Sequence, residues 1–435
     1  CLVRMYASRW NAGYAVTSSL TTHSQISLRA LFVFQSAFRV NFKRFHTMTN
    51  FGFHLPTEVQ FGPGKFATVG EVVAQFGKRC LLVTGPKTGS VRHFLPRLTL
   101  YLEEAGIEVA HFDGVIPNPT TDTIAAGAKL ASGHRADVVL GVGGGSAMDA
   151  AKAIAVEATH EGGCWDYLFY RDSKPTEKTL PIVAVSTTSG TGSQVTQVAV
   201  VTHTATRDKS ALYNSIIFPR VAIVDPELML SVPAHVTACT GFDAFTHAFE
   251  SAIHVNTSPY VELMAWEAIS LVIKHLPEAI KNGANIEARS ALAYADTLAG
   301  MCIAIAGVTL PHGMGMAIGG MYPQIAHGEA LALTYPAFTR FTYASAIKPF
   351  AKLGRLLNAE LEKEEDLKAA ELACDEFDMF LQQIGMWMSL ENKHVPEREL
   401  QALALQSRVL PDYMNNPRIA SESDMLEIIQ HSFRR

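Results

Sequence analysis

The sequence predicts an α/β domain with a parallel sheet, followed by an all-α domain. Short runs rich in Val, Ile and Leu alternate with helical patterns up to about residue 228, which favours a parallel sheet with helices on both faces. The four clearest strand candidates are residues 79–85, 136–144, 179–188 and 219–225. From about Ser231 onward the strand pattern is lost, and long amphipathic runs predict helices. We therefore place a domain boundary near residue 230, which gives an α/β domain over 48–230 and a helical domain over 231–435.

The first 47 residues differ in composition from the rest of the chain. They contain no Asp or Glu, but six Lys or Arg residues and six Ser residues. An Arg- and Ser-rich segment without acids is typical of a mitochondrial presequence. The alternative is an upstream reading frame that is never translated, because residue 1 is Cys and the sequence from Met48 reads as a normal start. We favour this alternative, and in either case expect residues 1–47 to be a disordered leader.

Composition excludes several classes of protein. The chain has 435 residues, of which 48% are hydrophobic and 18% charged, and these values predict a globular protein with a large core. The formal net charge of −5 gives no basic surface for nucleic acid, and no stretch is long and apolar enough for a membrane span. Six cysteines without paired spacing indicate reduced thiols and a cytoplasmic protein, or one of the mitochondrial matrix if the leader is a presequence.

Four residues of the second half have side chains that suit a metal ion. Asp243 and His247 stand four apart in a helical pattern, so both lie on one helix face. His312 and His327 follow in apolar, small-residue surroundings. One carboxylate with three imidazoles suits Fe(II) or Zn(II) better than calcium or magnesium, and it favours an open catalytic site. The alternative is that these are separate core or surface histidines. We expect His235, His254 and His275 to be helix-surface or interdomain residues rather than ligands.

A glycine-rich turn in the α/β domain predicts a phosphate site. Gly143, Gly144 and Gly145 follow a predicted strand and precede a helix, where free N–H groups and the helix dipole attract an anion. Ser146 is expected to cap this helix, with Asp149 completing a capping box. The alternative is an ordinary glycine turn, since the segment is not the G-x-G-x-x-G fingerprint. A second polar run, STTSGTGS at residues 186–193, adds hydroxyls after the next strand.

These motifs together resemble the iron-containing (group III) alcohol dehydrogenase family. DAFTHAFES with the later PHG and AHG, GVGGGSAMDAAKAIA and STTSGTGSQVT occur in the family's order and spacing, and the resemblance extends from about Asn50 to the C-terminus. It implies a dehydroquinate synthase-like architecture, with a Rossmann-like dinucleotide-binding domain and a helical metal-binding domain. It also implies a metal-dependent NAD(P) alcohol dehydrogenase or aldehyde reductase that transfers hydride reversibly between a small primary alcohol and nicotinamide, as a homodimer.

The resemblance assigns roles to individual positions. The metal, Fe(II) or Zn(II), would be held by Asp243, His247, His312 and His327, and catalysis would act through it. The cofactor would be contacted by Gly85, Lys87, Asn118, Gly143, Gly144, Gly145, Ser146, Asp149, Thr187, Thr188, Thr191 and Ser193.

The preference between NAD and NADP depends on the end of the first nucleotide-domain strand. Members that prefer NAD tend to carry an acid there, which binds the ribose hydroxyls and repels a 2′-phosphate. Here the position is Gly85, and Lys87 follows two residues later. We expect NADP or dual use, with Lys87 pairing with the phosphate; the alternative is that Lys87 is a solvated loop lysine.

Two departures from the family pattern bear on the substrate. Met316 stands where many members have a second active-site histidine, which predicts a less polar pocket suited to alkyl alcohols rather than polyols. Gln194 stands where relatives often have Glu. Alternative functions on the same architecture are a glycerol dehydrogenase-like polyol oxidation, a dehydroquinate synthase-like lyase, or a non-catalytic binding protein. The intact ligand set, without a Lys/Arg cluster beside it, argues against the last two.

Overall fold

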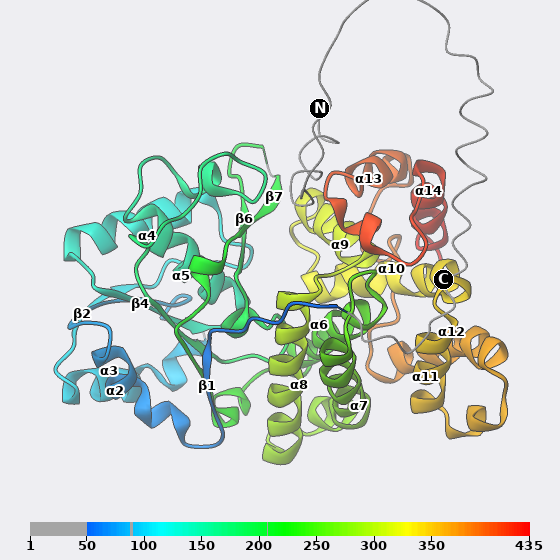
Figure 1. Ribbon diagram of the computed structural model, residues 1–435, viewed down its shortest axis with the longest axis horizontal. Coiled ribbons are helices and arrows are strands. Elements are labelled where there is room, and N and C mark those ends of the chain that lie inside the picture. The colour runs from blue at the N-terminus through cyan, green and yellow to red at the C-terminus, as the bar shows by residue number, and fades with distance from the viewer. Residues whose placement is uncertain (1–49, 88–89, 207) are drawn as a thin grey trace, which may run out of the picture. The chain divides into compact units, whose positions relative to one another are not determined.

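A six-stranded parallel sheet forms the centre of the N-terminal half (Figure 1). The computed structural model describes residues 50–87, 90–206 and 208–435, so the leader expected over residues 1–47 lies outside the described residues. The strands run in the order β1-β8-β5-β4-β2-β3, and every neighbouring pair is parallel. Their bounds are Glu58–Phe61 (β1), Arg79–Val83 (β2), Glu108–Phe112 (β3), Val138–Gly143 (β4), Ile182–Ser186 (β5) and Val221–Val224 (β8).

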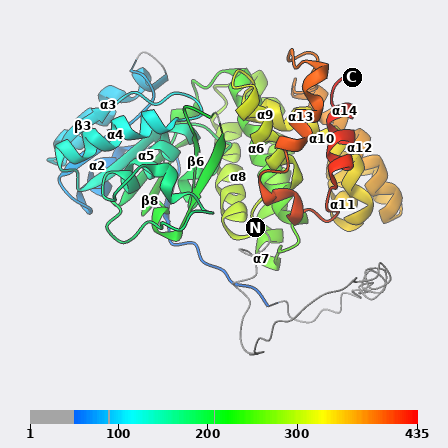
Figure 2. The same cartoon turned by 90° about the horizontal axis from the view of Figure 1, so that it is seen from above.

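Helices cover both faces of this sheet, as Figures 1 and 2 show. Alternate residues of β2 point to opposite faces, because successive side chains of a strand alternate. Leu81 and Val83 pack in one core with α4 and α5, whereas Cys80 and Leu82 pack in another with α2 and α3. The bounds of these helices are Val69–Ala74 (α2), Leu95–Glu104 (α3), Thr121–His134 (α4) and Gly145–Glu157 (α5). The predicted parallel sheet covered on both faces is therefore confirmed.

The carboxyl ends of the strands define where a ligand can bind. From β2 the chain continues to β3 on one side, whereas β4, its other neighbour, continues to β5 on the opposite side. Strand order thus reverses between β2 and β4, and open α/β sheets bind ligands in the crevice at such a point. Gly85 follows β2 and Gly143 ends β4, so both predicted cofactor positions lie beside this crevice.

A two-stranded hairpin, which the sequence did not predict, follows β5 in the chain. Strands β6 (Val198–Thr202) and β7 (Lys209–Tyr213) pair antiparallel. Both alternate buried with partly exposed residues, and their connecting turn lacks the Asn-Gly or Asp-Gly signal of a tight hairpin. The hairpin matters for function because it places Lys209 near the predicted metal ligands, as described below.

The C-terminal half is helical, and its helix α6 (Ala234–Ile253) lies in the interior. From Thr237 to its end nearly every residue of α6 is buried, and Phe242, Phe245 and Phe249 pack into the main apolar core. Such an all-round apolar helix is stable only when other helices surround it. The others are α7 (Pro259–Lys281), α8 (Ile286–Ile305), α9 (Leu310–Met321), α10 (His327–Thr342), α11 (Ile347–Leu357), α12 (Asp366–Gln383), α13 (Leu400–Gln406) and α14 (Glu422–His431).

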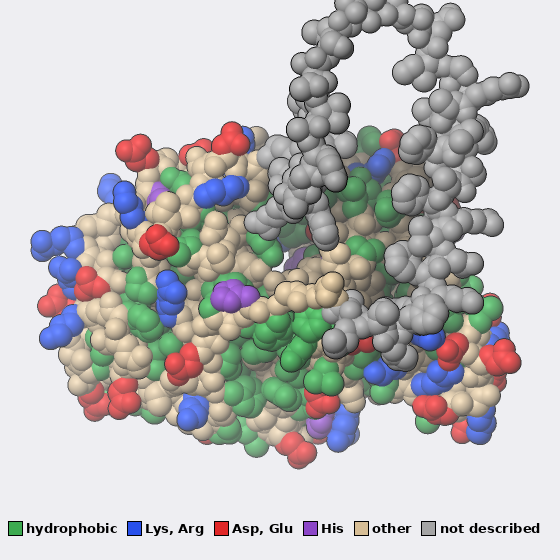
Figure 3. All heavy atoms as spheres, in the orientation of Figure 1, with side chains coloured by type: hydrophobic (Ala, Val, Ile, Leu, Met, Phe, Trp, Pro, Cys, Tyr) green, Lys and Arg blue, Asp and Glu red, His purple; other side chains and the backbone are tan. Residues whose placement is uncertain are grey.

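The surface shows no grouping of basic side chains on the face drawn in Figure 3, where acidic and basic residues are interspersed. Apolar side chains gather there over α7 and α8, where Tyr260, Leu263 and Tyr294 are exposed. Within the described residues no single helix meets the length and hydropathy needed to cross a bilayer. Helices α8 and α9 do so only as a pair, with a bend of 101° between them.

Two glycines bring the α/β half and α8 into backbone contact. Gly192 has a φ of +60°, and a Cβ there would lie 2.3 Å from the Cα of Gly300 on α8. A Cβ on Gly300 would lie 2.7 Å from the Cα of Gly192 and 2.7 Å from Val195 Cγ2. Because backbone atoms are on both sides, neither position has room for a methyl group.

We expect Gly300→Ala to destabilise the protein by about 1–3 kcal/mol, the usual cost of overpacking. Urea unfolding followed by circular dichroism measures the change. The control is Gly133→Ala, an exposed position of α4 where a Cβ meets no atom within 4 Å. This control should stabilise the protein by roughly 0.5–1 kcal/mol, because alanine is the better helix former. Equal stability of Gly300→Ala and the wild type would contradict the close contact.

Candidate metal and cofactor site

Helix α6 positions three polar side chains inside the apolar core. Asp243, His247 and Glu250 follow one another at about one helical turn, so they share one face. Their exposed fractions are 3%, 6% and 0%. Burying charged or polar groups is costly unless they are paired, so this face must meet partners from other elements. His312 of α9 and His327, the first residue of α10, supply them.

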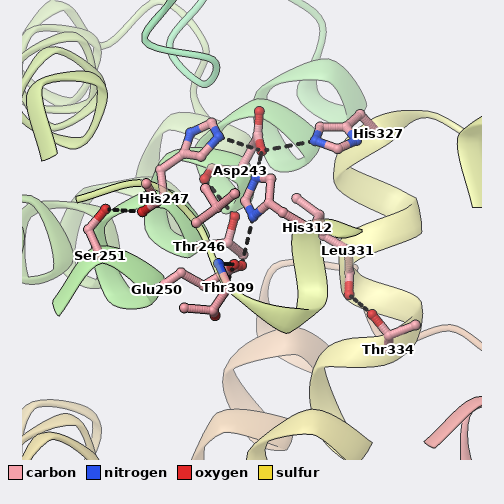
Figure 4. Close-up of polar contacts among 12 residues, drawn as sticks. Asp243, Thr246, His247, Glu250, Ser251, Thr309, His312, His327, Leu331 and Thr334 are labelled. Carbon is pink, nitrogen blue, oxygen red and sulfur yellow. Dashed lines mark hydrogen bonds and ion pairs between the residues drawn. The ribbon is translucent and has the colours of Figure 1, made fainter. Parts of the chain in front are cut away.

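The carboxylate of Asp243 lies at the centre of three imidazoles (Figure 4). Its Oδ1 is 3.7 Å from His247 Nε2, 3.6 Å from His312 Nε2 and 3.8 Å from His327 Nε2. The ligand atoms of Asp243, His312 and His327 all lie within 4.8 Å of one another. These separations exceed hydrogen bonds, but they match the roughly 3.3–3.8 Å between ligand atoms of a tetrahedral site with bonds of about 2.0–2.3 Å.

The opposite ring nitrogens are held by hydrogen bonds. His312 Nδ1 lies 2.8 Å from Glu250 Oε1, and His247 Nδ1 lies 3.0 Å from the carbonyl oxygen of Gly190. The second oxygen of Glu250 accepts from the backbone N–H and the hydroxyl of Thr309. With Nδ1 donating outward, Nε2 of both rings is left free to face Asp243. This outer arrangement is typical of histidines that bind metals.

Electrostatics favour a cation at this position. Asp243 Oδ1 and His312 Nε2 are buried and have no hydrogen-bond partner. Burial raises the pKa of Asp243, but the facing histidines outweigh it and bring the value to about 2. Burial also lowers the pKa of His247 and of His327, which keeps these imidazoles neutral. Burial lowers the pKa of His312 too, but the carboxylates of Glu250 and Asp243 outweigh it and raise the value to about 10. A bound cation would take the place of that proton between His312 and the permanent carboxylate of Asp243, and the donor set suits iron or zinc.

The predicted phosphate loop lies against the second polar run. Gly144 caps α5 with extended backbone, and Gly143 has a φ of +155°. A Cβ on Gly144 would lie 3.1 Å from Thr188 Oγ1, and one on Gly145 would lie 2.7 Å from Thr191 Oγ1. The two segments, separate in sequence, thus form one polar surface at the N-terminus of α5. Free N–H groups and hydroxyls meet there, as a diphosphate requires.

The capping role expected for Ser146 and Asp149 is wrong. Gly144 is the N-cap and makes no side-chain bond, because Ser146 already lies inside the first turn. Ser146 Oγ instead accepts from the backbone N–H of Asn118. Asp149 Oδ1 accepts from the hydroxyl of Ser193 at 2.6 Å, and Oδ2 accepts from Val200 N–H. Thr187 is buried, and its N–H donates to the carbonyl of Gly143.

Two lysines, the buried Lys152 and the half-buried Lys209, were not identified from the sequence. Lys152 donates to Ser193, to Thr196 and to the carbonyl of Val198, so it fastens the loop after β5. Lys209 Nζ donates to Asn118 Oδ1 at 2.9 Å. Burial lowers the pKa of Lys209 to about 8, although the charges of nearby acids, Asp243 among them, oppose the shift. No local motif marks Lys209, since the hairpin alone brings it to the site.

Lys209 also lines a pocket beside the metal ligands. The pocket has a volume of ≈ 260 Å³ and is bounded by α9, the hairpin and the C-terminal segment. Met316 contributes one wall, one turn along α9 from His312. Its lining residues are Thr206, Asp208, Lys209, Gly313, Met316, Ala317, Gly320, Met321, Gln406, Val409 and Leu410.

There is room for a side chain at Gly85, just after β2. Among the described residues, a Cβ there would meet only the carbonyl of Val115, at 3.6 Å. Lys87 Nζ lies 4.0 Å from a carboxylate oxygen of Asp113, and both side chains are about half exposed. Lys87 therefore already faces an acid, which weakens its attraction for a phosphate, because Asp113 adds a negative charge nearby.

Asp296 of α8 connects the cofactor side to the helical half. Its carboxylate accepts from Gly192 N–H and from Gln194 Nε2, both at 2.8 Å. Burial raises the pKa of Asp296 to about 7, against the effect of these hydrogen bonds. Gln194 therefore acts as a neutral donor where a glutamate would add a second buried carboxylate. This is the structural consequence of the sequence departure at position 194.

We expect Glu250→Gln to weaken divalent-metal binding by about 10- to 100-fold, the usual effect of removing an outer hydrogen-bond partner of a metal-binding histidine. Equilibrium dialysis against Zn(II) with a competing chelator measures it. Glu267→Gln, an exposed position on α7, is the matched control and should bind like the wild type. Unchanged affinity of Glu250→Gln in a folded protein would remove Glu250 from the site.

Comparison with known proteins gives the chain a family. The sequence pattern named "iron-containing alcohol dehydrogenase" matches residues 56–226, and that of the family's C-terminal domain matches residues 237–433. The chain is 35% identical to 1,3-propanediol dehydrogenase of Klebsiella pneumoniae over 385 residues, 88% of this chain and 99% of that one. It is 33% identical to the NAD-dependent methanol dehydrogenase of Bacillus methanolicus over 387 residues, 88% and 100% of the two chains.

Solved structures agree with this relationship. A 1,3-propanediol oxidoreductase superposes with a TM-score of 0.82 at 35% identity, covering 88% of this chain and 100% of that chain. An archaeal halo-thermophilic alcohol dehydrogenase from a Red Sea brine pool gives 0.84 at 33% identity, covering 89% and 100%. The parallel α/β domain, the helical domain and these matches together identify the chain as a member of the iron-containing alcohol dehydrogenase family.

Proposed function

We propose that this protein is a metal-dependent NAD(P) alcohol dehydrogenase that interconverts small primary alcohols and their aldehydes. The observation that carries the proposal is the buried Asp243 carboxylate facing three imidazole nitrogens at 3.6–3.8 Å. Asp243, His247, His312 and His327 would hold the metal, which would supply Lewis-acid polarisation of the substrate oxygen. The nicotinamide cofactor would supply the hydride acceptor or donor.

The chain's own residues account for orientation and charge. The carbonyl of Gly190 and the carboxylate of Glu250 fix two imidazoles, so their Nε2 atoms converge. The N-terminus of α5, with Gly143–Gly145 and the hydroxyls of Thr188 and Thr191, supports the cofactor diphosphate. Lys209 Nζ donates a hydrogen bond to Asn118 Oδ1 beside the pocket. From there it would donate a further hydrogen bond to the polar end of a substrate or to the cofactor.

The pocket supports short alkyl or diol substrates. Met316 removes the imidazole that many members have there, and Ala317, Met321, Val409 and Leu410 add apolar surface. Lys209, Asp208 and Gln406 leave one polar side. Relatives of similar identity are named for 1,3-propanediol and for methanol, which agrees with a small alcohol. Polyol oxidation of the glycerol dehydrogenase kind is less well supported. The thioether of Met316 stands where many family members have a histidine, which makes the pocket less polar.

Three expectations stay predictions. The exact boundary near residue 230 falls in the connection between β8 and α6. A homodimer is supported by the edge position of β1 and by the exposed apolar side chains on α7 and α8. The cytoplasmic assignment, with its mitochondrial alternative, depends on residues 1–47, which lie outside the described part of the chain.

Turnover should depend on the bound metal. We expect protein treated with EDTA to regain aldehyde-dependent oxidation of NADH or NADPH when Fe(II) or Zn(II) is restored without oxygen. His312→Ala should lose at least about 100-fold in kcat/KM, because a metal ligand is removed. His431→Ala, exposed at the end of α14, is the control and should keep full activity. Metal-independent turnover, or none by metal-loaded protein with any short aldehyde, would contradict the proposal.

Dual use of NAD and NADP is proposed from the open end of β2. Gly85→Asp introduces an acid where the structure has room for a side chain. We expect kcat/KM for NADPH to fall at least about tenfold, roughly 1.4 kcal/mol, because the new carboxylate repels the 2′-phosphate. The value for NADH should hold or rise. Lys87→Met serves as the comparison variant. An unchanged ratio of kcat/KM for NADPH to that for NADH in Gly85→Asp would place the 2′-phosphate elsewhere.

A further inference from the structure

A second group of metal-binding side chains lies on α6 and α10, two of the three helices that carry the candidate ligands. His235 and Cys239 of α6 converge with Glu329 of α10, and their ligand atoms all lie within 4.8 Å of one another. We propose that these three residues form a second, separate cation site that binds Zn(II). The inference does not depend on the proposed activity, because none of the three belongs to the Asp243 cluster.

The separations fit a tetrahedral ion. Cys239 Sγ lies 3.6 Å from His235 Nε2, and that nitrogen lies 3.3 Å from Glu329 Oε1. Ligand atoms around tetrahedral zinc lie roughly 3.3–3.8 Å apart, given bonds of about 2.0–2.3 Å. One thiolate, one imidazole and one carboxylate suit zinc, because a soft sulfur ligand excludes calcium and magnesium. The fourth position is left to water.

Burial gives the site a solvent side and an interior side. Cys239 and Glu329 are each 6% exposed, whereas the side chain of His235 is 63% exposed. An ion would therefore enter past His235 and reach the thiol behind it. The sequence predicted His235 to be a helix-surface or interdomain residue rather than a ligand; its exposure fits the surface position, and the proposal departs from the second part of that prediction. Glu329 completes the group only because α10 packs against α6, which already carries His235 and Cys239.

The backbone fixes this convergence closely. A Cβ on Gly328 would lie 2.2 Å from the carbonyl oxygen of Cys239, so the start of α10 touches α6 without an intervening side chain. Glu329 is the third residue of α10, and its Oε2 accepts a hydrogen bond from the backbone N–H of Ala326, which precedes the helix. That bond orients the carboxylate and leaves Oε1 directed at His235. The geometry thus rests on a helix cap as well as on packing.

Lys393 occupies the position that the ion would compete for. Its Nζ lies 2.7 Å from Glu329 Oε1, and its side chain is 27% exposed. When zinc binds, this ammonium would move toward solvent, and the carboxylate would exchange a single positive charge for a divalent one. Removal of Lys393 should therefore strengthen zinc binding, whereas a merely structural role of the ion pair predicts no gain.

Cobalt(II) distinguishes this site from the Asp243 cluster, because only a thiolate ligand gives a sulfur-to-cobalt charge-transfer band. The experiment titrates Co(II) into full-length protein loaded with one equivalent of Fe(II) and free of zinc, with Cys1→Ser present throughout because residue 1 lies outside the described residues. We expect a band that saturates at one equivalent and is bleached by Zn(II). Cys239→Ser should abolish it, and His235→Ala, an exposed substitution, should weaken Co(II) binding by at least about tenfold.

Two further variants complete the test. Cys302→Ala removes a buried thiol of α8 elsewhere in the core and should leave the band unchanged. Lys393→Met should raise Co(II) affinity severalfold. A missing band in folded protein, a band that persists in Cys239→Ser, or equal affinity of the His235→Ala and wild-type proteins would overturn the proposal. None of these outcomes depends on enzyme activity, so failure of the proposed dehydrogenase function would be seen separately.

Discussion

The buried carboxylate of Asp243 is the feature on which the rest of the site depends. A charged group in an apolar core is stable only when opposite charge or ligating atoms surround it. Asp243 stands on α6 among Phe242, Phe245 and Phe249, which hold that helix at the centre of the helical half. The same packing that buries the charge leaves one open direction, toward the three imidazoles. The core therefore makes the buried charge of Asp243 costly, and it also fixes the arrangement of imidazoles in which a cation would compensate that charge.

That geometry is shared between the two halves of the chain. His247 is hydrogen-bonded to the carbonyl oxygen of Gly190, and Asp296 accepts a hydrogen bond from Gly192 N–H. These contacts connect the loop after β5 to α6 and α8. The close approach of Gly192 and Gly300 removes any intervening side chain. Hydride transfer requires reacting atoms placed within a few tenths of an ångström, and rigid contacts of this kind supply such placement. The polar loop is thus a structural connection as well as the proposed cofactor surface.

The sequence predicted those parts of the fold whose signals are local. Strands β2, β4, β5 and β8 were found because both faces of a parallel sheet are buried and their sequences are continuous apolar runs. Edge strands β1 and β3 are partly exposed, and their mixed composition gave no such signal. The four ligand candidates were recognised from residue type and spacing, and from resemblance to a family.

Long-range contacts account for what was missed. Ser146 looked like a helix cap in sequence, but the glycine before it takes that position, and the hydroxyl is used by Asn118 N–H instead. Lys209 and Asp296 reach the site through the hairpin and through α8, so neither stands in a motif. Glu329 is two residues from His327, yet Gly328 between them touches α6, so the two side chains face different clusters. The close contact between Gly328 and α6 thus decides which side chains converge, and this contact cannot be recognised from residue type alone.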